Sequence, residues 1–169
     1  TYDVLKVVDY ARLRAATILG ITNTLGSTLT RVSRAYILQQ SGPEIGVAAT
    51  KTFTSQLIVL AQIALRLAKL KGKLSQDELD ELKEGLQRMP SIVEEVLARE
   101  EKVRQLAKKY ANEKLFVFLG KGISSATALE ARLKLLEITY IPSLFYPAGE
   151  SKHGPISIIE EGTPVVFIC

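Results

Sequence analysis

Three charged residues recur at helical spacing in the last third of the sequence. Glu130, Lys134 and Glu137 stand at i, i+4 and i+7, so a helix would place them on one face. The simplest interpretation is a surface ion pair, which adds about 0.2–0.5 kcal/mol to a helix. Neighbouring leucines, however, put this face at the edge of a core. A partly buried carboxylate beside a lysine can carry a proton, because burial and the ammonium shift its pKa in opposite directions.

The only histidine, His153, lies in the turn-like segment 149–155, GESKHGP. A lone histidine is more often structural, but this glycine- and proline-containing context argues against a core role. Histidine titrates near neutrality, which suits acid–base catalysis in a loop at the carboxyl end of a strand. One histidine and one cysteine argue against a transition-metal centre. We therefore expect neither a metal nor a cofactor.

Two glycine-containing segments could approach an oxygen-rich ligand. Residues 42–53, GPEIGVAATKTF, lead into a long predicted helix whose first N–H groups would be free. Residues 120–122, Gly-Lys-Gly, follow an apolar strand but lack the full dinucleotide-binding fingerprint. For both segments an ordinary loop or helix cap is the alternative.

The elements that must position these residues alternate between helices and apolar strands. This pattern predicts an α/β fold with parallel sheets and helices on both faces. A long helical stretch separates two groups of strands. It predicts a first domain at 1–72, a helical connection at 73–112 and a second domain at 113–169. The predicted helices are 1–13, 47–71, 75–89, 90–111 and 124–140, and the predicted strands are 16–22, 35–38, 115–119, 143–146 and 165–168.

Composition narrows the class of protein. The net charge of +4 is modest and scattered, which argues weakly for a small anionic ligand and against nucleic acid. The single cysteine, Cys169, excludes a disulfide framework and favours a cytoplasmic location. The most apolar run, 57–61, meets polar and charged residues too soon for a membrane span. The absent initiator methionine and the apolar last residues lead us to expect an internal fragment of a longer protein.

Two segments resemble a known family. Residues 42–57, GPEIGVAATKTFTSQL, and 129–155, LEARLKLLEITYIPSLFYPAGESKHGP, resemble the isomerase half of the glutamine–fructose-6-phosphate aminotransferases. That half contains two sugar isomerase (SIS) domains, and the resemblance covers essentially the whole chain. It implies parts of two flavodoxin-like, three-layer αβα domains and a sugar-phosphate substrate. It also implies synthesis of glucosamine 6-phosphate from fructose 6-phosphate and glutamine-derived ammonia, with a glutaminase domain in the parent chain.

The resemblance also implies catalytic roles. Glu137 resembles the base that moves a proton between C1 and C2 of the open-chain sugar. Lys134 resembles the lysine that assists near that centre. His153 resembles the histidine that opens the sugar ring from the neighbouring subunit, which implies a homodimer.

The implied substrate contacts lie nearer the amino end. Val47, with Ala48 and Ala49 beside it, resembles a segment whose backbone contacts the sugar, although family members often have serine at position 49. Thr1 resembles the last threonine of the phosphate-binding loop. We expect the rest of that loop and the family's Schiff-base lysine to lie outside these residues. The chain alone should therefore show no turnover.

Two other functions stay open. One is a double-SIS sugar-phosphate deaminase or a deglycase of glycated amino acids, either of which would have no glutaminase. The other is a non-catalytic SIS sensor of sugar phosphates. The joint presence of Glu137, Lys134 and His153 argues against a sensor, because a sensor needs a phosphate loop but no proton shuttle.

Overall fold

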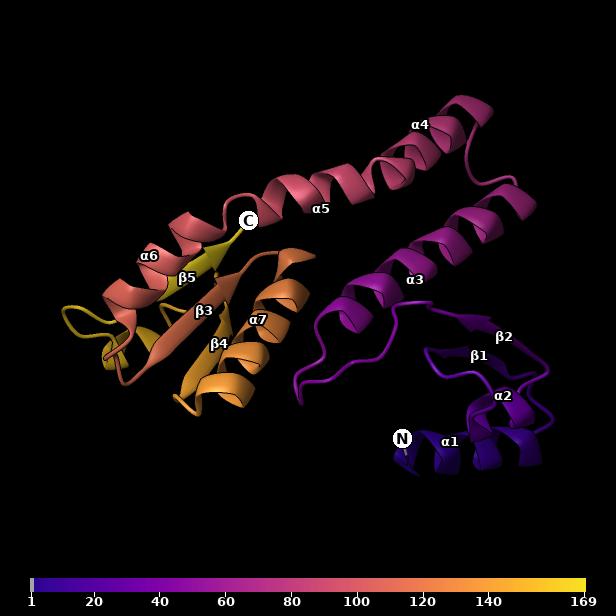
Figure 1. Cartoon of the computed structure of the whole chain (residues 1–169), viewed down its shortest axis with the longest axis horizontal. Coiled ribbons are helices and arrows are strands. Elements are labelled where there is room, and N and C mark those ends of the chain that lie inside the picture. The colour runs from indigo at the N-terminus through magenta and orange to yellow at the C-terminus, as the bar shows by residue number, and fades with distance from the viewer. Residues whose placement is uncertain (1) are drawn as a thin grey trace. The chain divides into compact units, whose positions relative to one another are not determined.

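The computed structural model describes residues 2–169. They form two compact units, the first ending at Met89 and the second spanning Pro90–Cys169. Each unit contains its own sheet, and every strand pair is parallel (Figure 1). The predicted α/β class with parallel sheets is therefore confirmed. The domain limits at residues 72 and 112 stay a prediction.

The first unit combines a two-stranded sheet with four helices. β1 and β2 pair from Leu19 opposite Ala35 to Thr22 opposite Leu38. Helix α2 packs on β1, and α3 packs on α4. The loops that follow β1 and β2 leave the same edge of the sheet, where α/β proteins usually bind ligands. The elements are α1 (Tyr2–Leu13), β1 (Leu19–Thr22), α2 (Thr28–Val32), β2 (Ala35–Leu38), α3 (Lys51–Leu70) and α4 (Gln76–Gln87).

The second unit is built on a three-stranded sheet in the order β4-β3-β5. Helix α7 packs on all three strands (Figure 1). The buried core residues of this unit include Val117, Phe118 and Leu119 on β3 and Ala128 on α7. The elements are α5 (Met89–Leu97), whose first residue closes the first unit, α6 (Glu100–Tyr110), β3 (Phe116–Gly120), α7 (Ser124–Thr139), β4 (Ser143–Pro147), the short 3₁₀ helix η1 (Pro155–Ile158) and β5 (Val165–Ile168).

Local sequence explains how β3 leads into α7. The strand reads FVFLG, and its last four residues are buried, as expected for the central strand of a parallel sheet. Its last residue must be small. A Cβ on Gly120 would lie 2.6 Å from the carbonyl oxygen of Ser124 and 2.7 Å from the Cα of Ser125. The glycine therefore lets the first turn of α7 approach the end of the strand.

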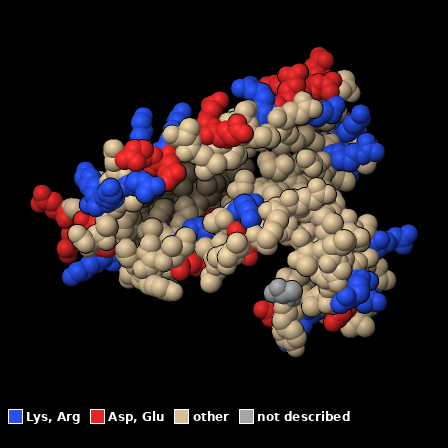
Figure 2. Space-filling model, in the orientation of Figure 1, with Lys and Arg blue, Asp and Glu red and all other residues tan. Residues whose placement is uncertain are grey.

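Helices α4 and α6 carry charges of both signs on exposed faces (Figure 2). A capping box starts α4: Ser75 Oγ accepts from the Glu78 N–H, and the Glu78 carboxylate accepts from the Ser75 N–H. On α6, Arg104 pairs with two acidic residues one turn earlier. These helices therefore have solvated, charged faces.

Two element boundaries differ from the prediction by three residues or more, and one short helix is additional. Helix α3 begins at Lys51 rather than at 47, because side-chain contacts of Glu44 hold the preceding residues as a loop. The first strand begins at Leu19 rather than at 16. The short helix α2, capped by the Ser27 side chain, was not predicted.

The predicted helix over 90–111 is also wrong as a single element, because the structure divides it into α5 and α6. The Arg99 N–H bonds to the carbonyl of Val96, three residues back, at 3.1 Å. This tighter turn interrupts the α-helical ladder. Neither Gly nor Pro marks the position in the sequence.

Helix α3 is the one helix within residues 2–169 whose length and composition would allow it to cross a membrane. Its 20 residues include the run 57–61 together with Arg66 and Lys69. The charged residues that argued against a span therefore lie inside the helix.

Candidate active site

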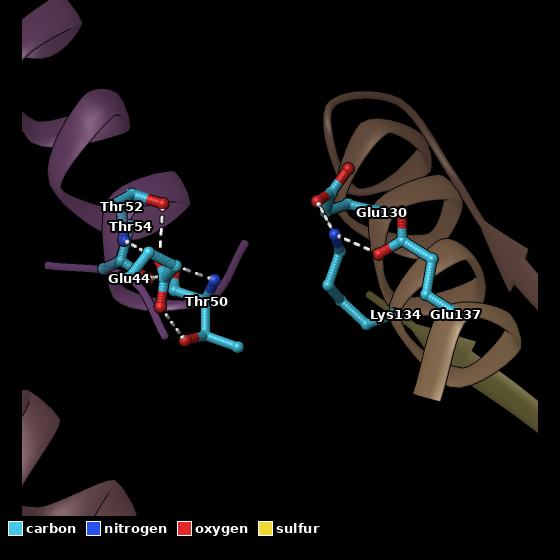
Figure 3. A network of polar contacts seen from close by, with 7 residues as sticks. All are labelled: Glu44, Thr50, Thr52, Thr54, Glu130, Lys134 and Glu137. Carbon is cyan, nitrogen blue, oxygen red and sulfur yellow. Dashed lines mark hydrogen bonds and ion pairs between the residues drawn. The ribbon is translucent and has the colours of Figure 1, made fainter. Parts of the chain in front are cut away.

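Helix α7 brings Glu130, Lys134 and Glu137 together in the second unit (Figure 3). Lys134 Nζ lies 3.2 Å from Glu130 Oε1 and 2.7 Å from Glu137 Oε2. The predicted common face is thus confirmed. Because the three residues are spaced by three and four positions on one helix, both carboxylates reach the same ammonium.

The cluster is partly shielded from water. The side chain of Lys134 is 21% exposed, that of Glu130 24% and that of Glu137 30%. The hydrogen bond to Glu137 raises the pKa of Lys134, burial opposes it, and Glu130 raises it further. Lys134 is therefore charged at neutral pH. Two carboxylates share this one cation, which leaves a net negative site with a carboxylate held in a defined orientation.

His153 lies in the turn between β4 and η1. Its backbone N–H donates to the carbonyl of Glu150 at 3.0 Å, and its side chain is exposed. Within residues 2–169, the His153 side chain makes no hydrogen bond or ion pair with the α7 cluster. The second unit therefore contains all three predicted catalytic residues but joins only Lys134 and Glu137 directly.

The predicted sugar-contact residues lie in the first unit, in the loop before α3. Val47 is 96% exposed, Ala48 is buried and Ala49 is half-buried. Thr1 lies outside the described residues. The structure thus presents Val47 to solvent in a loop, whereas the sequence had placed it at the start of the long helix.

Sequence reasoning missed Glu44. Its carboxylate accepts four hydrogen bonds, from the N–H and the hydroxyl of both Thr50 and Thr52 (Figure 3). The hydroxyl of Thr52 contributes most to lowering the pKa of Glu44 to about 2. The sequence signal for these contacts is weak. Glu44 lies six residues before Thr50 and eight before Thr52, and no common helix-capping motif has that spacing.

An open cavity of about 810 Å³ lies at the carboxyl ends of β1 and β2. It is lined by Ile21, Thr22, Asn23, Thr24, Leu25, Gln39, Gly42, Pro43, Glu44, Thr52 and Gln56. Within residues 2–169, no cluster of three or more His, Cys, Asp or Glu side chains could hold a metal ion. The expectation that no cofactor is needed stays a prediction.

Comparison with known families decides what this fold is. The model of the SIS domain matches residues 1–66 and 109–169. The chain belongs to the SIS domain family. The first match includes most of α3, and the second includes the α7 cluster and His153, so both candidate segments lie within SIS sequence.

Curated relatives resemble the chain along its whole length. The glutamine–fructose-6-phosphate aminotransferase (isomerizing) of Thermococcus kodakarensis is 44% identical over 99% of this SIS chain. The protein of the same name from Thermus thermophilus is 42% identical over 100%. In both comparisons the chain spans 28% of the relative's length.

Solved structures give the same fold. The C-terminal domain of glucosamine-fructose-6-phosphate aminotransferase from Francisella tularensis matches with a TM-score of 0.95 and 34% identity, covering 99% of this chain and 47% of that one. A glucosamine-6-phosphate deaminase from Thermotoga maritima matches with a TM-score of 0.74 and 27% identity, covering 98% and 48%.

Proposed function

We propose that this SIS chain is part of the isomerase portion of a hexosamine synthase. The whole enzyme would make glucosamine 6-phosphate from fructose 6-phosphate and ammonia that its glutaminase domain releases from glutamine. One observation carries the proposal: a partly buried carboxylate, Glu137, is fixed 2.7 Å from a charged lysine on an SIS helix. The names of the relatives at 42–44% identity support the substrate.

Glu137 is the base in this proposal. As a carboxylate it takes the proton from C1 of the open-chain sugar and returns it at C2. Lys134 holds Glu137 in place through their ion pair. Its ammonium also stabilises the negative charge that develops on the substrate as the C–H bond breaks.

The remaining residues bind and prepare the sugar. His153 opens the ring from the neighbouring subunit of a homodimer. Its exposed position in a turn supports a contact with another subunit. The loop with Val47, Ala48 and Ala49 contacts the sugar, and Thr1 contacts its phosphate. No cofactor takes part.

The proposal also includes the cellular location of the protein and its domain organisation. Residues 51–66 of α3 fall within the SIS match, so we assign α3 to the domain rather than to a membrane. The protein acts in the cytoplasm on a small sugar phosphate and binds no nucleic acid. Residues 1–72 and 113–169 belong to two SIS domains, and 73–112 connect them.

The deciding experiment uses the natural protein that contains these residues. Incubation with fructose 6-phosphate and glutamine should yield glucosamine 6-phosphate. A glutamine-independent deaminase is the second candidate, favoured by the Thermotoga maritima neighbour. It would instead release ammonia from glucosamine 6-phosphate. Binding of the sugar phosphate with neither conversion would indicate a sensor and contradict both enzyme proposals.

A further inference from the structure

The loop 45–49 is exposed and poorly packed. Ile45 is 93% exposed and Val47 is 96% exposed, while a Cβ added to Gly46 would meet nothing within 4 Å. Only Ala48 is buried. Within residues 2–169, no hydrogen bond between backbone groups joins residues 45–49 to another segment. Packing and backbone pairing therefore leave the conformation of this loop largely undetermined.

Polar side chains fix both ends of the loop instead. At the end of the loop where α3 begins, the N–H groups of Thr50 and Thr52 donate to Glu44 Oε2 at 3.2 Å and 3.1 Å. The hydroxyls of the same threonines donate to this carboxylate at 3.0 and 2.5 Å. Glu44 and Thr50 flank residues 45–49, so these bonds close the loop on itself and fix it to the first turn of α3 (Figure 3).

A second side chain fixes the approach to the loop. Asn23, directly after β1, donates to the carbonyl of Gly42 at 2.6 Å and accepts from the N–H of Ser41 at 3.0 Å. The hydroxyl of Ser41 also bonds to that of Ser55 on α3. The chain on both sides of the loop is thus attached to rigid elements of the first unit.

Most of the acceptor capacity of Glu44 is already used within the protein. A carboxylate offers about four acceptor positions, and of the four hydrogen bonds from Thr50 and Thr52, three go to Oε2 and one goes to Oε1. Its negative charge also lies at the amino end of α3, where the helix dipole favours an anion. These contacts make support of the loop the main role of the Glu44 carboxylate.

We infer that Glu44 is a positioning residue that fixes the conformation of loop 45–49 for contact with the substrate, with Asn23 fixing the approach to it. This inference rests on the proposed function, in which the backbone of this loop contacts the sugar. It predicts that loss of the Glu44 contacts weakens substrate binding more than it slows the chemical step. A misplacement of about 1 Å can cost up to about a hundredfold in rate.

The test compares Glu44→Ala with a matched variant of another helix cap, in the natural protein that contains this chain. Glu78 caps α4 through Ser75 in a similar way but lies in no proposed site, so Glu78→Ala controls for the loss of a cap. Amide hydrogen exchange at Thr50 and Thr52 and the KM and kcat for fructose 6-phosphate are measured for both variants.

For Glu44→Ala we expect faster exchange of the Thr50 and Thr52 amides, which lose their acceptor. We also expect a fall in kcat/KM of about ten- to a hundredfold, mainly through KM. Glu44→Gln keeps one acceptor oxygen, so its exchange rate and its kcat/KM should lie between those of Glu44→Ala and the wild type. Glu78→Ala should leave both measurements near the wild-type values. If Glu44→Ala changes neither the exchange nor kcat/KM, the inference is wrong while the proposed function stands. If the wild-type protein does not bind the sugar phosphate, the proposed function and this inference both fail.

Discussion

Glu130 and Glu137 contact the same ammonium from opposite sides along α7, so they differ little in their immediate charge environment. Their side chains are 24% and 30% exposed. Helical spacing alone could predict that both lie beside Lys134, and the structure confirms it. Spacing could not decide which carboxylate acts as the base, because that depends on where the sugar lies. The family resemblance made this assignment, and it stays a prediction.

A single-residue prediction concerns Glu44 in acid. Its pKa is lowered from 4.5 to about 2, so the folded state favours the ionised form. The stabilisation is therefore fully present above pH 4.5 and is lost as the pH falls towards about 2. We expect the wild type to have a higher urea denaturation midpoint than Glu44→Gln above pH 4.5, and this advantage to disappear near pH 2.

Comparing the two proteins at each pH removes the contribution of other titrating carboxylates, which both share. A difference in midpoint that stays constant through the acid range would show that the charge of Glu44 contributes nothing. The hydrogen bonds from Thr50 and Thr52 would then be ordinary polar contacts.

At the scale of elements, local signals predicted most boundaries. The strand at 35–38 and the strand at 165–168 were placed at their observed limits, because each is a short apolar run that follows a polar or glycine-containing segment. The start of α4 was also predicted, since Ser75 and Glu78 form a capping box within four residues. Where sequence and structure agree, the predictive signal is local: an apolar run or a cap within a few residues.

The start of α3 was predicted wrongly because it depends on contacts that the local sequence pattern does not reveal. Small residues with helical propensity extend to position 47, but Glu44 accepts hydrogen bonds from Thr50 and Thr52 and holds the intervening residues outside the helix. Such contacts depend on the loop returning on itself, which spacing rules do not detect. The candidate loop site was therefore located correctly in sequence but given the wrong conformation.

The junction between β3 and α7 provides an element-scale prediction. Gly120→Ala would place a Cβ 2.6 Å from a backbone carbonyl oxygen, and backbone atoms cannot move aside cheaply. We expect a destabilisation of about 1–3 kcal/mol, seen as a lower urea midpoint. Gly85→Ala on the exposed face of α4 is the control, because its Cβ would meet nothing within 4 Å. It should raise stability by about 0.5–1 kcal/mol. Equal midpoints for the two variants would contradict the close approach.

At the scale of the whole molecule, the proposed reaction needs residues from more than one place. Glu137 and Lys134 meet on α7, whereas the exposed His153 makes no hydrogen bond or ion pair with them within residues 2–169. The proposal that His153 acts in the neighbouring subunit accounts for this separation. No sequence pattern could establish that arrangement, because a single chain does not specify its partner.

Mixed dimers test the arrangement. Glu137→Gln and His153→Ala chains, each inactive alone, are coexpressed with different tags. If His153 acts across a two-fold interface, each mixed dimer has one site with both residues intact. Random pairing should then restore about a quarter of the wild-type activity. If His153 serves its own subunit, every site stays defective, and no recovery above the separate variants should be seen.

The most direct test of the central claim, that Glu137 is the proton-transferring base, is the kcat of Glu137→Gln beside that of Glu130→Gln. Both variants remove one carboxylate from the same lysine at similar exposure. In the natural protein that contains this chain, we expect Glu137→Gln to lower kcat by about 10²–10⁴-fold. Glu130→Gln should lower it by less than about tenfold, since its loss removes only a charge contact. Equal losses in the two variants, or near-normal turnover by Glu137→Gln, would contradict the claim.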